Sequence, residues 1–407
     1  MGYLLQNGGL GMAGDWIITG GRPLQGRVEV PAAKNSVLPL LAASLLCSRP
    51  VRLQNVPRLT DVEDCLALLR GVDCTAGWQG AELVVQGQPM RTDLAPEAAG
   101  RMRASILFCA PLLARLGRVS TVLPGGCRIG ARPIDLHLQG LAQMGVRQLP
   151  AAPGQLTLYA PAGLRGAEIC LSFPSVGATE TLLLAAATAQ GQTVLHGAAK
   201  EPEIADLAAF LNACGGCVEG VGTDTIRVQG RRCLAGCTFM PVADRIIAST
   251  LACAAATAGG RVELAGCAPG LYAPLLAAVM LCAQGESCLQ DRVFENRFAC
   301  AEGFAALGAN VRVAERTLYV QPGGALHGAR LTAPDLRGGA ALALAALAAR
   351  GSSRLGGVEF VRRGYADLDR LLAGLGAQIW QEIPARSGVV KKTPTKKQFC
   401  LAIGAKK

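Results

Sequence analysis

The chain has 407 residues, half of them apolar, and a formal net charge of +11. This length exceeds one ordinary domain and supplies enough apolar side chains for two hydrophobic cores, which excludes a small or largely disordered protein. The longest apolar runs, 271–283 and 340–349, are too short to cross a bilayer and predict buried helices. The 16 cysteines are scattered without a regular framework, and no signal stretch precedes them, so we expect a reducing cytoplasm.

The positive charge is concentrated in the C-terminal tail. From Pro384 onward the tail carries Arg386 and six lysines, with no acid after Glu382, which accounts for +7 of the +11. Such a tail is either a solvated terminus or an arm for nucleic acid. Aromatic residues make up 4% of the chain and do not alternate with basic ones, which favours the solvated terminus.

The predicted elements repeat along the chain. An Ala/Leu-rich helix, a turn of small residues and a short strand occur in this order six times, at 34–56, 103–123, 177–198, 245–266, 271–291 and 338–358. A second pattern, an amphipathic helix that ends at a glycine before a strand, occurs five times. Its glycines are Gly71, Gly145, Gly215, Gly308 and Gly376. The repetition predicts an α/β protein built from similar helix-plus-sheet units.

One unit is incomplete. Gly215 and Gly308 lie 93 residues apart, whereas two units need about 140. About 47 residues are therefore missing between Gly266 and Leu271, unless the ancestral number of units was never six. The six copies of the first pattern favour a loss. Six units suit two lobes of three, with helices packed inward and ligands bound between the lobes.

The segment 122–137, VLPGGCRIGARPIDLH, combines turn formers with a thiol and two cations. Its glycines allow a loop that closes over a ligand, and Arg128 and Arg132 flank Cys127 closely enough to lower the pKa of a thiol or to bind an anion beside it. The alternative is a small buried side chain near a turn. Spacing alone leaves both interpretations open.

Other cations follow turn residues or begin helices. They are Lys34, Arg103, Arg337 and Arg363. Each alone is typical of a surface charge, but together in one cleft they would bind a phosphate or carboxylate.

Four cysteines, Cys214, Cys217, Cys233 and Cys237, have the spacing C-x2-C-x15-C-x3-C, which superficially resembles a zinc site. CGGC falls at the helix-ending turn that other units fill with LGA or MGV, so the repeat explains it without a metal. His137, His196 and His327 lack metal-ligand spacing, and no phosphate-binding glycine motif of the Walker or dinucleotide type is present.

From about Ile17 to Gln378 the chain resembles the enolpyruvyl transferases, and among them the branch that uses UDP-N-acetylglucosamine. The matching segments include GGRPLQGRVEVPAAKNSVLPLLAA, MRASILF, LPGGCRIGARPIDLH, FPSVGATET, KEPEIADLAAFLN, ADRI, VFENRF, DLR and RRGY. The branch of aromatic amino-acid synthesis lacks PGGC and SVGAT and fits poorly.

The resemblance implies a two-lobed inside-out α/β barrel of repeated helix-sheet units, with one repeat truncated. The first lobe would contain 1–33 and 242–407, with the truncation near 266–271 and the basic tail at 384–407. The second lobe would contain 34–241 and carry the PGGC loop. Met12 precedes the family-like start, so we expect residues 1–11 to be an upstream extension.

The implied activity is transfer of the enolpyruvyl group of phosphoenolpyruvate to the 3'-hydroxyl of UDP-N-acetylglucosamine, the first committed step of peptidoglycan synthesis. The resemblance implies a cytoplasmic enzyme with no cofactor, metal, nucleic acid, membrane or obligate protein partner. By motif, Lys34, Arg103, Arg132 and Arg363 would hold phosphoenolpyruvate, and Cys127 would transfer protons. The UDP-sugar would contact Asn35, Arg132, Pro133, Ile134, Asp135, Leu136, Ser175, Val176, Gly177 and Val293, while Asp335 and Arg337 would lie near the reacting groups.

The chain departs from the family pattern at one catalytic position. Where the family carries an aspartate that acts on the sugar hydroxyl, this chain has Leu271, and no Asp or Glu lies between Glu263 and Glu286. Losing a general base costs about 10² to 10⁴ in rate. The sequence therefore predicts either an active transferase or a catalytically impaired paralogue that binds phosphoenolpyruvate or the UDP-sugar.

Overall fold

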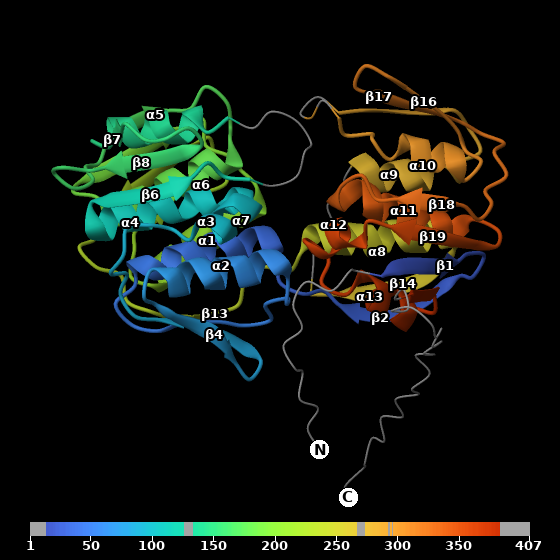
Figure 1. The fold of residues 1–407 in the computed structure, drawn as a ribbon, viewed down its shortest axis with the longest axis horizontal. Helices are drawn as coiled ribbons and strands as arrows, with labels where there is room; N and C mark the ends of the chain where they lie inside the picture. The colour runs from blue at the N-terminus through green and yellow to red at the C-terminus, as the bar shows by residue number, and fades with distance from the viewer. Residues whose placement is uncertain (1–13, 126–132, 267–272, 292–293, 295, 383–407) are drawn as a thin grey trace, which may run out of the picture.

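The computed structural model describes residues 14–125, 133–266, 273–291, 294 and 296–382. Its helices and strands form two bodies side by side (Figure 1). The buried apolar residues form two separate clusters, one between Ala32 and Leu234 and the other combining 16–30 with 247–379. We propose that these clusters are the cores of the second and the first lobe, respectively, as defined above.

The Ala/Leu-rich segments form the central helices of both bodies. They are α1 (Lys34–Ala43), α4 (Cys109–Leu116), α6 (Val176–Ala186), α8 (Arg245–Ala258), α9 (Ala273–Met280) and α11 (Leu336–Ala348). In the second unit, the 3-10 helix η2 (Arg103–Phe108) precedes α4, where the sequence predicts one longer helix. Pro111 lies in the first turn of α4, where a proline is tolerated because the N–H that it lacks would have no partner inside the helix.

The amphipathic segments form shorter helices nearer the surface. They are α2 (Thr60–Gly71), α5 (Asp135–Gln143), α7 (Pro202–Ala213), α10 (Ala301–Ala306) and α13 (Leu368–Gly374), with α3 (Pro96–Arg101) and α12 (Val358–Arg362) beside them. Four of the five predicted glycines take positive φ after their helix, from 90° at Gly215 to 98° at Gly376. In the first unit Gly71 ends α2, and Asp73 takes the positive φ of 70°.

The second lobe contains three open sheets. The first has the order β13 (Thr238–Phe239), β3 (Val51–Leu53), β5 (Glu82–Gln86), β4 (Thr75–Gln79). The second has the order β6 (Arg118–Val122), β8 (Gln155–Tyr159), β7 (Arg147–Leu149). The third has the order β11 (Val218–Glu219), β12 (Thr225–Gln229), β10 (Gln192–His196), β9 (Glu168–Cys170).

The first lobe also contains three sheets, one of them small. The largest has the order β18 (Arg330–Thr332), β19 (Ser352–Gly356), β1 (Asp15–Thr19), β20 (Gln378–Glu382). Another has the order β15 (Ser287–Gln290), β17 (Thr317–Gln321), β16 (Asn310–Ala314). The smallest pairs β14 (Gly260–Ala265) with β2 (Leu24–Glu29) in parallel.

The two-stranded sheet is the truncated unit. In the other five sheets, the strand after the central helix pairs with an antiparallel neighbour, as β3 does with β5. Within the described residues, β14 has no antiparallel neighbour. Val51 and Leu53 on β3 are fully buried, whereas Val262 and Leu264 on β14 stay partly exposed. The missing residues therefore correspond to the part of the unit that would pair with β14 and bury Val262 and Leu264.

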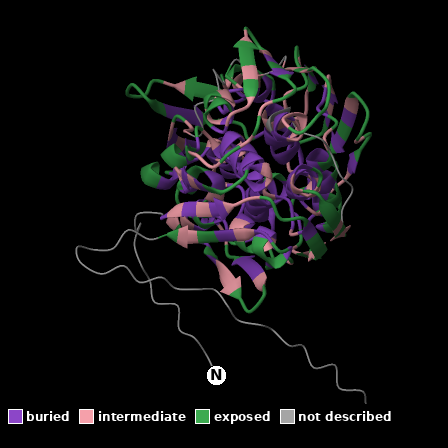
Figure 2. Ribbon diagram, turned by 90° about the vertical axis from the view of Figure 1, so that its right-hand side faces the viewer, coloured by how far each residue is buried: buried purple, intermediate pink, exposed green. Residues whose placement is uncertain are grey.

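Figure 2 shows the resulting layers: buried helices occupy the centre, and the partly exposed strands lie around them. This is the inside-out arrangement that the sequence predicts. None of the described helices is long and apolar enough to cross a membrane.

Candidate active site

Two crossings of the chain connect the lobes, and each leads into a central helix. Ala32 and Ala243 form an antiparallel bridge between the crossings. The Asp244 side chain caps α8 by accepting hydrogen bonds from the backbone N–H groups of Ile246 and Ile247, at 2.8 and 3.1 Å. Its other oxygen accepts from the backbone N–H of Lys34 at 3.3 Å. The starts of α1 and α8 are therefore held at one place, between the lobes.

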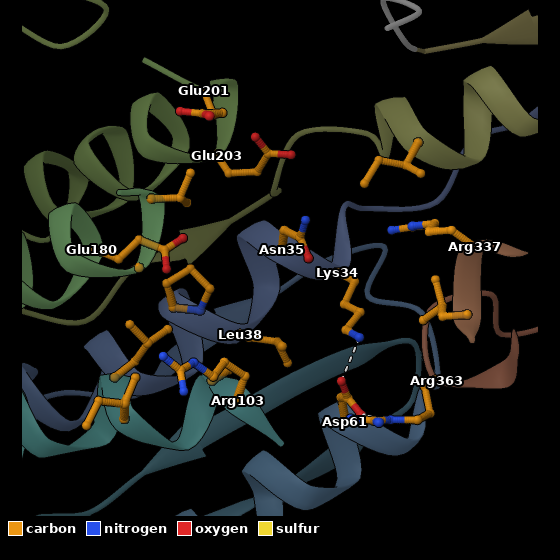
Figure 3. Close-up of a pocket in the computed structure, with 18 of the residues that line it drawn as sticks. Lys34, Asn35, Leu38, Asp61, Arg103, Glu180, Glu201, Glu203, Arg337 and Arg363 are labelled. Atoms are coloured by element: carbon orange, nitrogen blue, oxygen red, sulfur yellow. Dashed lines mark hydrogen bonds and ion pairs between the residues drawn. The ribbon is translucent and has the colours of Figure 1, made fainter. Parts of the chain in front are cut away.

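A pocket of about 500 Å³ opens at this place and is lined by residues of both lobes. It brings together eight of the residues singled out from the sequence: Lys34, Asn35, Arg103, Val176, Gly177, Asp335, Arg337 and Arg363. Figure 3 shows Lys34 and Asn35 on α1, with Arg337 and Arg363 facing them from the other lobe. The pocket is therefore the candidate active site.

Asp61, on α2 of the second lobe, links cations of both lobes. Its carboxylate accepts from Lys34 Nζ at 2.6 Å and from Arg363 Nε at 3.3 Å (Figure 3). Arg363 also donates to the backbone oxygen of Arg101 at 3.0 Å. Because Asp61 is 4% exposed, both contacts form away from bulk water. Asp61 thus holds Lys34 and Arg363 in one orientation across the cleft.

The electrostatic balance at Lys34 differs from that of a surface lysine. Burial lowers its pKa from the usual 10.5, and the positive charges of Arg337 and Arg363 lower it further, while Asp61 opposes both effects. A lysine that is desolvated among guanidinium groups gains most from an added anion. The part of the pocket around Lys34, Arg337 and Arg363 therefore favours an anionic ligand.

Arg337 and Asp335 belong to the beginning of α11. Asp335 caps this helix, and its carboxylate accepts from the backbone N–H groups of Arg337 and Gly338 at 2.8 and 2.9 Å. The Arg337 guanidinium lies over the Tyr365 ring, 5.1 Å from its centre. These contacts fix the Arg337 side chain at the edge of the pocket.

Glu203 and Arg245 form a second ion pair between the lobes, from α7 to α8. Arg245 donates from Nε and Nη2 to the two carboxylate oxygens at 3.0 and 2.9 Å. Glu203 is 2% exposed. In this bidentate geometry the pair joins α7 of one lobe to α8 of the other.

The beginning of α6 forms one side of the pocket. The Ser175 hydroxyl caps the helix by accepting from the backbone N–H of Ala178 at 3.3 Å. A Cβ at Gly177 would lie 3.1 Å from Cε1 of His137, so a larger residue there would displace the histidine. Free backbone N–H groups at such a helix start bind anions such as phosphate.

Five further residues from the sequence analysis do not line the pocket. Pro133, Ile134, Asp135 and Leu136 form the loop and first turn of α5, and Ser175 acts as the α6 cap. The loop still contacts the site, because the backbone oxygen of Pro133 accepts from Arg103 Nη2 at 2.9 Å. Cys127, Arg132 and Val293 lie outside the described residues.

Apart from Asp335, the sequence analysis did not single out the acids of the pocket, nor two of its arginines. Asp61, Glu180, Glu201, Glu203, Arg245 and Arg297 all line it. Five of them stand in segments that carried the resemblance, so the motifs held a signal: Glu180 in FPSVGATET, Glu201 and Glu203 in KEPEIADLAAFLN, Arg245 in ADRI and Arg297 in VFENRF. No such signal marks Asp61, because the sequence pattern of its segment is that of an ordinary amphipathic helix.

The zinc-like cysteine motif is only partly assembled. Cys214 is buried at the end of α7, and its Sγ lies 3.2 Å from Sγ of Cys237. Cys217 is half-buried and Cys233 is exposed. Across the described ranges, no three His, Cys, Asp or Glu side chains are grouped as metal ligands.

His137 should make folding sensitive to acid. It is 5% exposed, its Nδ1 lies 2.8 Å from the Thr181 hydroxyl, and burial with the nearby Arg103 lowers its pKa to about 4. The unfolded chain takes up this proton near pH 6.5, so stability is lost as pH falls from 6.5 toward 4, by about 3 kcal/mol. Urea unfolding at pH 7 and pH 4 should show this loss in the wild type and a smaller one in His137→Gln. Equal pH dependence of the two proteins would contradict the assignment.

Comparisons with known proteins agree with the resemblance. The family model of EPSP synthase (3-phosphoshikimate 1-carboxyvinyltransferase) matches residues 18–272 and 271–372. The UDP-N-acetylglucosamine 1-carboxyvinyltransferase of Nitratidesulfovibrio vulgaris is 38% identical over 413 aligned positions, which cover 90% of this chain and 99% of that protein. UDP-N-acetylglucosamine 1-carboxyvinyltransferase 1 of Halalkalibacterium halodurans is 39% identical, over 89% and 93%.

These alignments also bear on the truncation. Since 90% of 407 residues is about 366, about 47 of the 413 positions have no residue from this chain. The number agrees with the deficit in the repeat spacing. The two segments matched by the family model meet at 271–272, beside the proposed gap.

Solved structures show the same fold. The enolpyruvyl transferase NikO from Streptomyces tendae matches with a TM-score of 0.79 at 24% identity, over 90% of this chain and 99% of that one. An EPSP synthase from Acinetobacter baumannii matches with a TM-score of 0.70 at 16% identity, over the same shares. With its matched family model, its relatives and its two-lobed fold, the chain belongs to the EPSP synthase family of enolpyruvyl transferases, beside the relatives named UDP-N-acetylglucosamine 1-carboxyvinyltransferase.

Proposed function

We propose that the chain transfers the enolpyruvyl group of phosphoenolpyruvate to the 3'-hydroxyl of UDP-N-acetylglucosamine, as the first committed step of peptidoglycan synthesis in the cytoplasm. The observation that carries the proposal is the meeting of Lys34 and Arg363 on Asp61, with Arg103 and Arg337 in the same pocket. Phosphoenolpyruvate carries a phosphate and a carboxylate, which cations from both lobes would bind as the cleft closes.

The substrates divide the pocket between them. Lys34, Arg103 and Arg363, together with Arg132 of the PGGC loop, would hold phosphoenolpyruvate. Asn35 would contact the sugar, and the start of α6 at Val176 and Gly177 would receive the diphosphate. The α5 turn from Pro133 to Leu136 would contact the uridine, with Val293 contributing from the opposite lobe. Asp335 and Arg337 would lie beside the reacting groups.

The chemistry is an addition followed by an elimination. The acceptor oxygen bonds to C2 of phosphoenolpyruvate while a proton is added at C3. Phosphate then leaves C2, C3 loses a proton, and the double bond returns. Cations fixed around the phosphate and carboxylate stabilise the charge that moves during both steps. Cys127 would exchange the proton at C3.

A second candidate function is binding without transfer. The chain lacks an acid between Glu263 and Glu286, next to the site of the missing residues, and this observation favours an impaired paralogue. Such a protein would bind phosphoenolpyruvate or the UDP-sugar in a regulatory or vestigial role. The cationic pocket serves either function, so turnover is the property that distinguishes them.

The test measures phosphate release with both substrates and identifies the product by mass spectrometry. We expect enolpyruvyl-UDP-N-acetylglucosamine at a kcat of about 1 s⁻¹ or more. Omission of the UDP-sugar is the control and should abolish phosphate release. Tight binding of both substrates by calorimetry with no product would instead establish the impaired paralogue.

Cys127 provides a separate test of the loop chemistry. Fosfomycin carries a phosphonate and an epoxide, and a reactive thiolate opens the epoxide to form a carbon–sulfur bond. We expect one fosfomycin per chain, on Cys127. Peptide mapping should find no label in Cys127→Ser. Equal labelling of the exposed Cys233 would show nonspecific reaction and contradict the role of the loop.

A further inference from the structure

One deeply buried acid of the pocket has no partner among the described residues. Glu180, in the second turn of α6, is 6% exposed, and its side chain points into the pocket (Figure 3). It forms no hydrogen bond or ion pair with any residue that the structure describes. Folded proteins satisfy almost all buried polar groups, so a vacant carboxyl that faces a ligand pocket indicates a contact with the ligand.

The other acids of the pocket are already engaged or lie near solvent. Asp61 holds Lys34 and Arg363, Glu203 holds Arg245, and Asp335 caps α11. Glu201 also lacks a described partner, but it stands half-exposed at the start of α7. Glu180 is therefore the one buried carboxyl among the described pocket residues with both oxygens available to a ligand.

The groups around Glu180 shift its pKa in the direction that favours uptake of a proton. Burial raises its pKa well above 4.5, and the negative charges of Glu203 and Glu201 raise it further. The other charged or titratable side chains that line the pocket, besides Glu203 and Glu201, are Lys34, Asp61, Arg103, His137, Arg245, Arg297, Asp335, Arg337 and Arg363. A carboxyl whose pKa is raised in this way accepts a proton more readily than a carboxyl at the surface.

We propose, on the basis of the function given above, that Glu180 accepts the proton of the acceptor hydroxyl during transfer. As the acceptor oxygen bonds to C2, its proton moves to Glu180, and Cys127 gives a proton to C3. In the elimination, C3 returns that proton to the thiolate, the C2–O bond to phosphate breaks, and the proton on Glu180 leaves with the phosphate. Both steps balance without a further reactant.

The inference explains how the chain reacts without an acid near Leu271. Glu180 lies on α6 of the second lobe, whereas the missing segment belongs to the first lobe. The truncation therefore leaves Glu180 and its neighbours Glu201 and Glu203 in place. A general base on α6 would therefore allow the chain to turn over its substrates although the segment of the first lobe is missing.

The kinetic test compares Glu180→Gln with the wild type and with Glu219→Gln, an exposed glutamate on β11. We expect kcat of Glu180→Gln to fall about 10²- to 10⁴-fold, with KM for phosphoenolpyruvate changed less than threefold. The rise of wild-type kcat with pH on the acid side should disappear in this variant, and Glu219→Gln should behave like the wild type. An unchanged kcat and pH profile in Glu180→Gln, with an active wild type, would overturn the role of Glu180 and leave the function intact.

A binding experiment keeps the inference testable where turnover is absent. A hydroxyl that donates to Glu180 favours its ionised form, so binding of UDP-N-acetylglucosamine near neutral pH should release protons. Calorimetry in two buffers of different ionisation enthalpy should detect this release in the wild type and not in Glu180→Gln. Equal release by both proteins would overturn the contact. Absent turnover together with the expected difference would refute the transferase activity and the proton transfer, and would leave the contact between Glu180 and the hydroxyl established.

Discussion

Replacing Lys34 by methionine is expected to lower kcat/KM for phosphoenolpyruvate about 10²- to 10⁴-fold, since removal of one partner from a desolvated charged contact costs about 3–5 kcal/mol. Methionine keeps most of the side-chain length and removes the ammonium group that Asp61 holds at 2.6 Å. Calorimetric titration with phosphoenolpyruvate should show the same loss of affinity. The wild type should also lose affinity at alkaline pH, as Lys34 deprotonates below its usual 10.5.

Two variants separate binding from stability. Lys34→Met leaves Asp61 buried with only Arg363 beside it, so part of any lost activity could reflect lost folding. Lys34→Met/Asp61→Asn removes that charge and should recover the thermal midpoint without recovering phosphoenolpyruvate affinity. Lys200→Met, at an exposed lysine outside the pocket, is the matched control and should bind normally. Normal binding by Lys34→Met would contradict the assignment.

The repeat pattern predicts the local units of the fold well. Helix-ending glycines such as Gly145 and Gly308 have positive φ because only glycine adopts it without strain, so the sequence marks the turns directly. The deficit between Gly215 and Gly308 likewise predicts the unit that now has only β14 and β2. Each turn and each helix-strand repeat is formed by residues that are close in sequence, so the sequence pattern predicts them.

The sequence pattern does not predict how the strands of the first lobe pair. β1 lies between β19 and β20, and its residues pair with partners more than 300 positions away. No short-range pattern specifies that register, because it depends on which hydrophobic faces meet after the chain has returned from the second lobe. The resemblance supplies this information, whereas periodicity does not.

The same limit applies to the pocket. Cations stood out in the sequence because they follow turns, and Lys34, Arg103, Arg337 and Arg363 do meet. The acids that position them look like surface charges on amphipathic helices. Asp61 links the two lobes only because Arg363, 302 residues away, shares its carboxylate with Lys34. Burial of a charge is a tertiary property, so spacing alone does not reveal it.

The second large effect is expected at the ion pair between the lobes. Arg245→Met should lower the free energy of unfolding by about 3–5 kcal/mol, because it leaves the Glu203 carboxylate buried without its two donors. The change also removes one cation from a pocket that Glu180, Glu201 and Glu203 line. Urea unfolding should show a lower midpoint with a similar slope.

The double variant Arg245→Met/Glu203→Gln tests the cause of this loss. It removes the buried charge as well as its partner and should recover most of the stability, since an unpaired ion costs more than a missing pair. Arg91→Met is the matched control: its pair with Asp73 has the same 3.0 Å contact but is exposed, with 67% and 41% of the two side chains accessible. That change should cost less than about 1 kcal/mol. If Arg245→Met lowered the free energy of unfolding no more than Arg91→Met, the contact between α7 and α8 would not hold the lobes together. Other contacts would then have to align the two sides of the pocket.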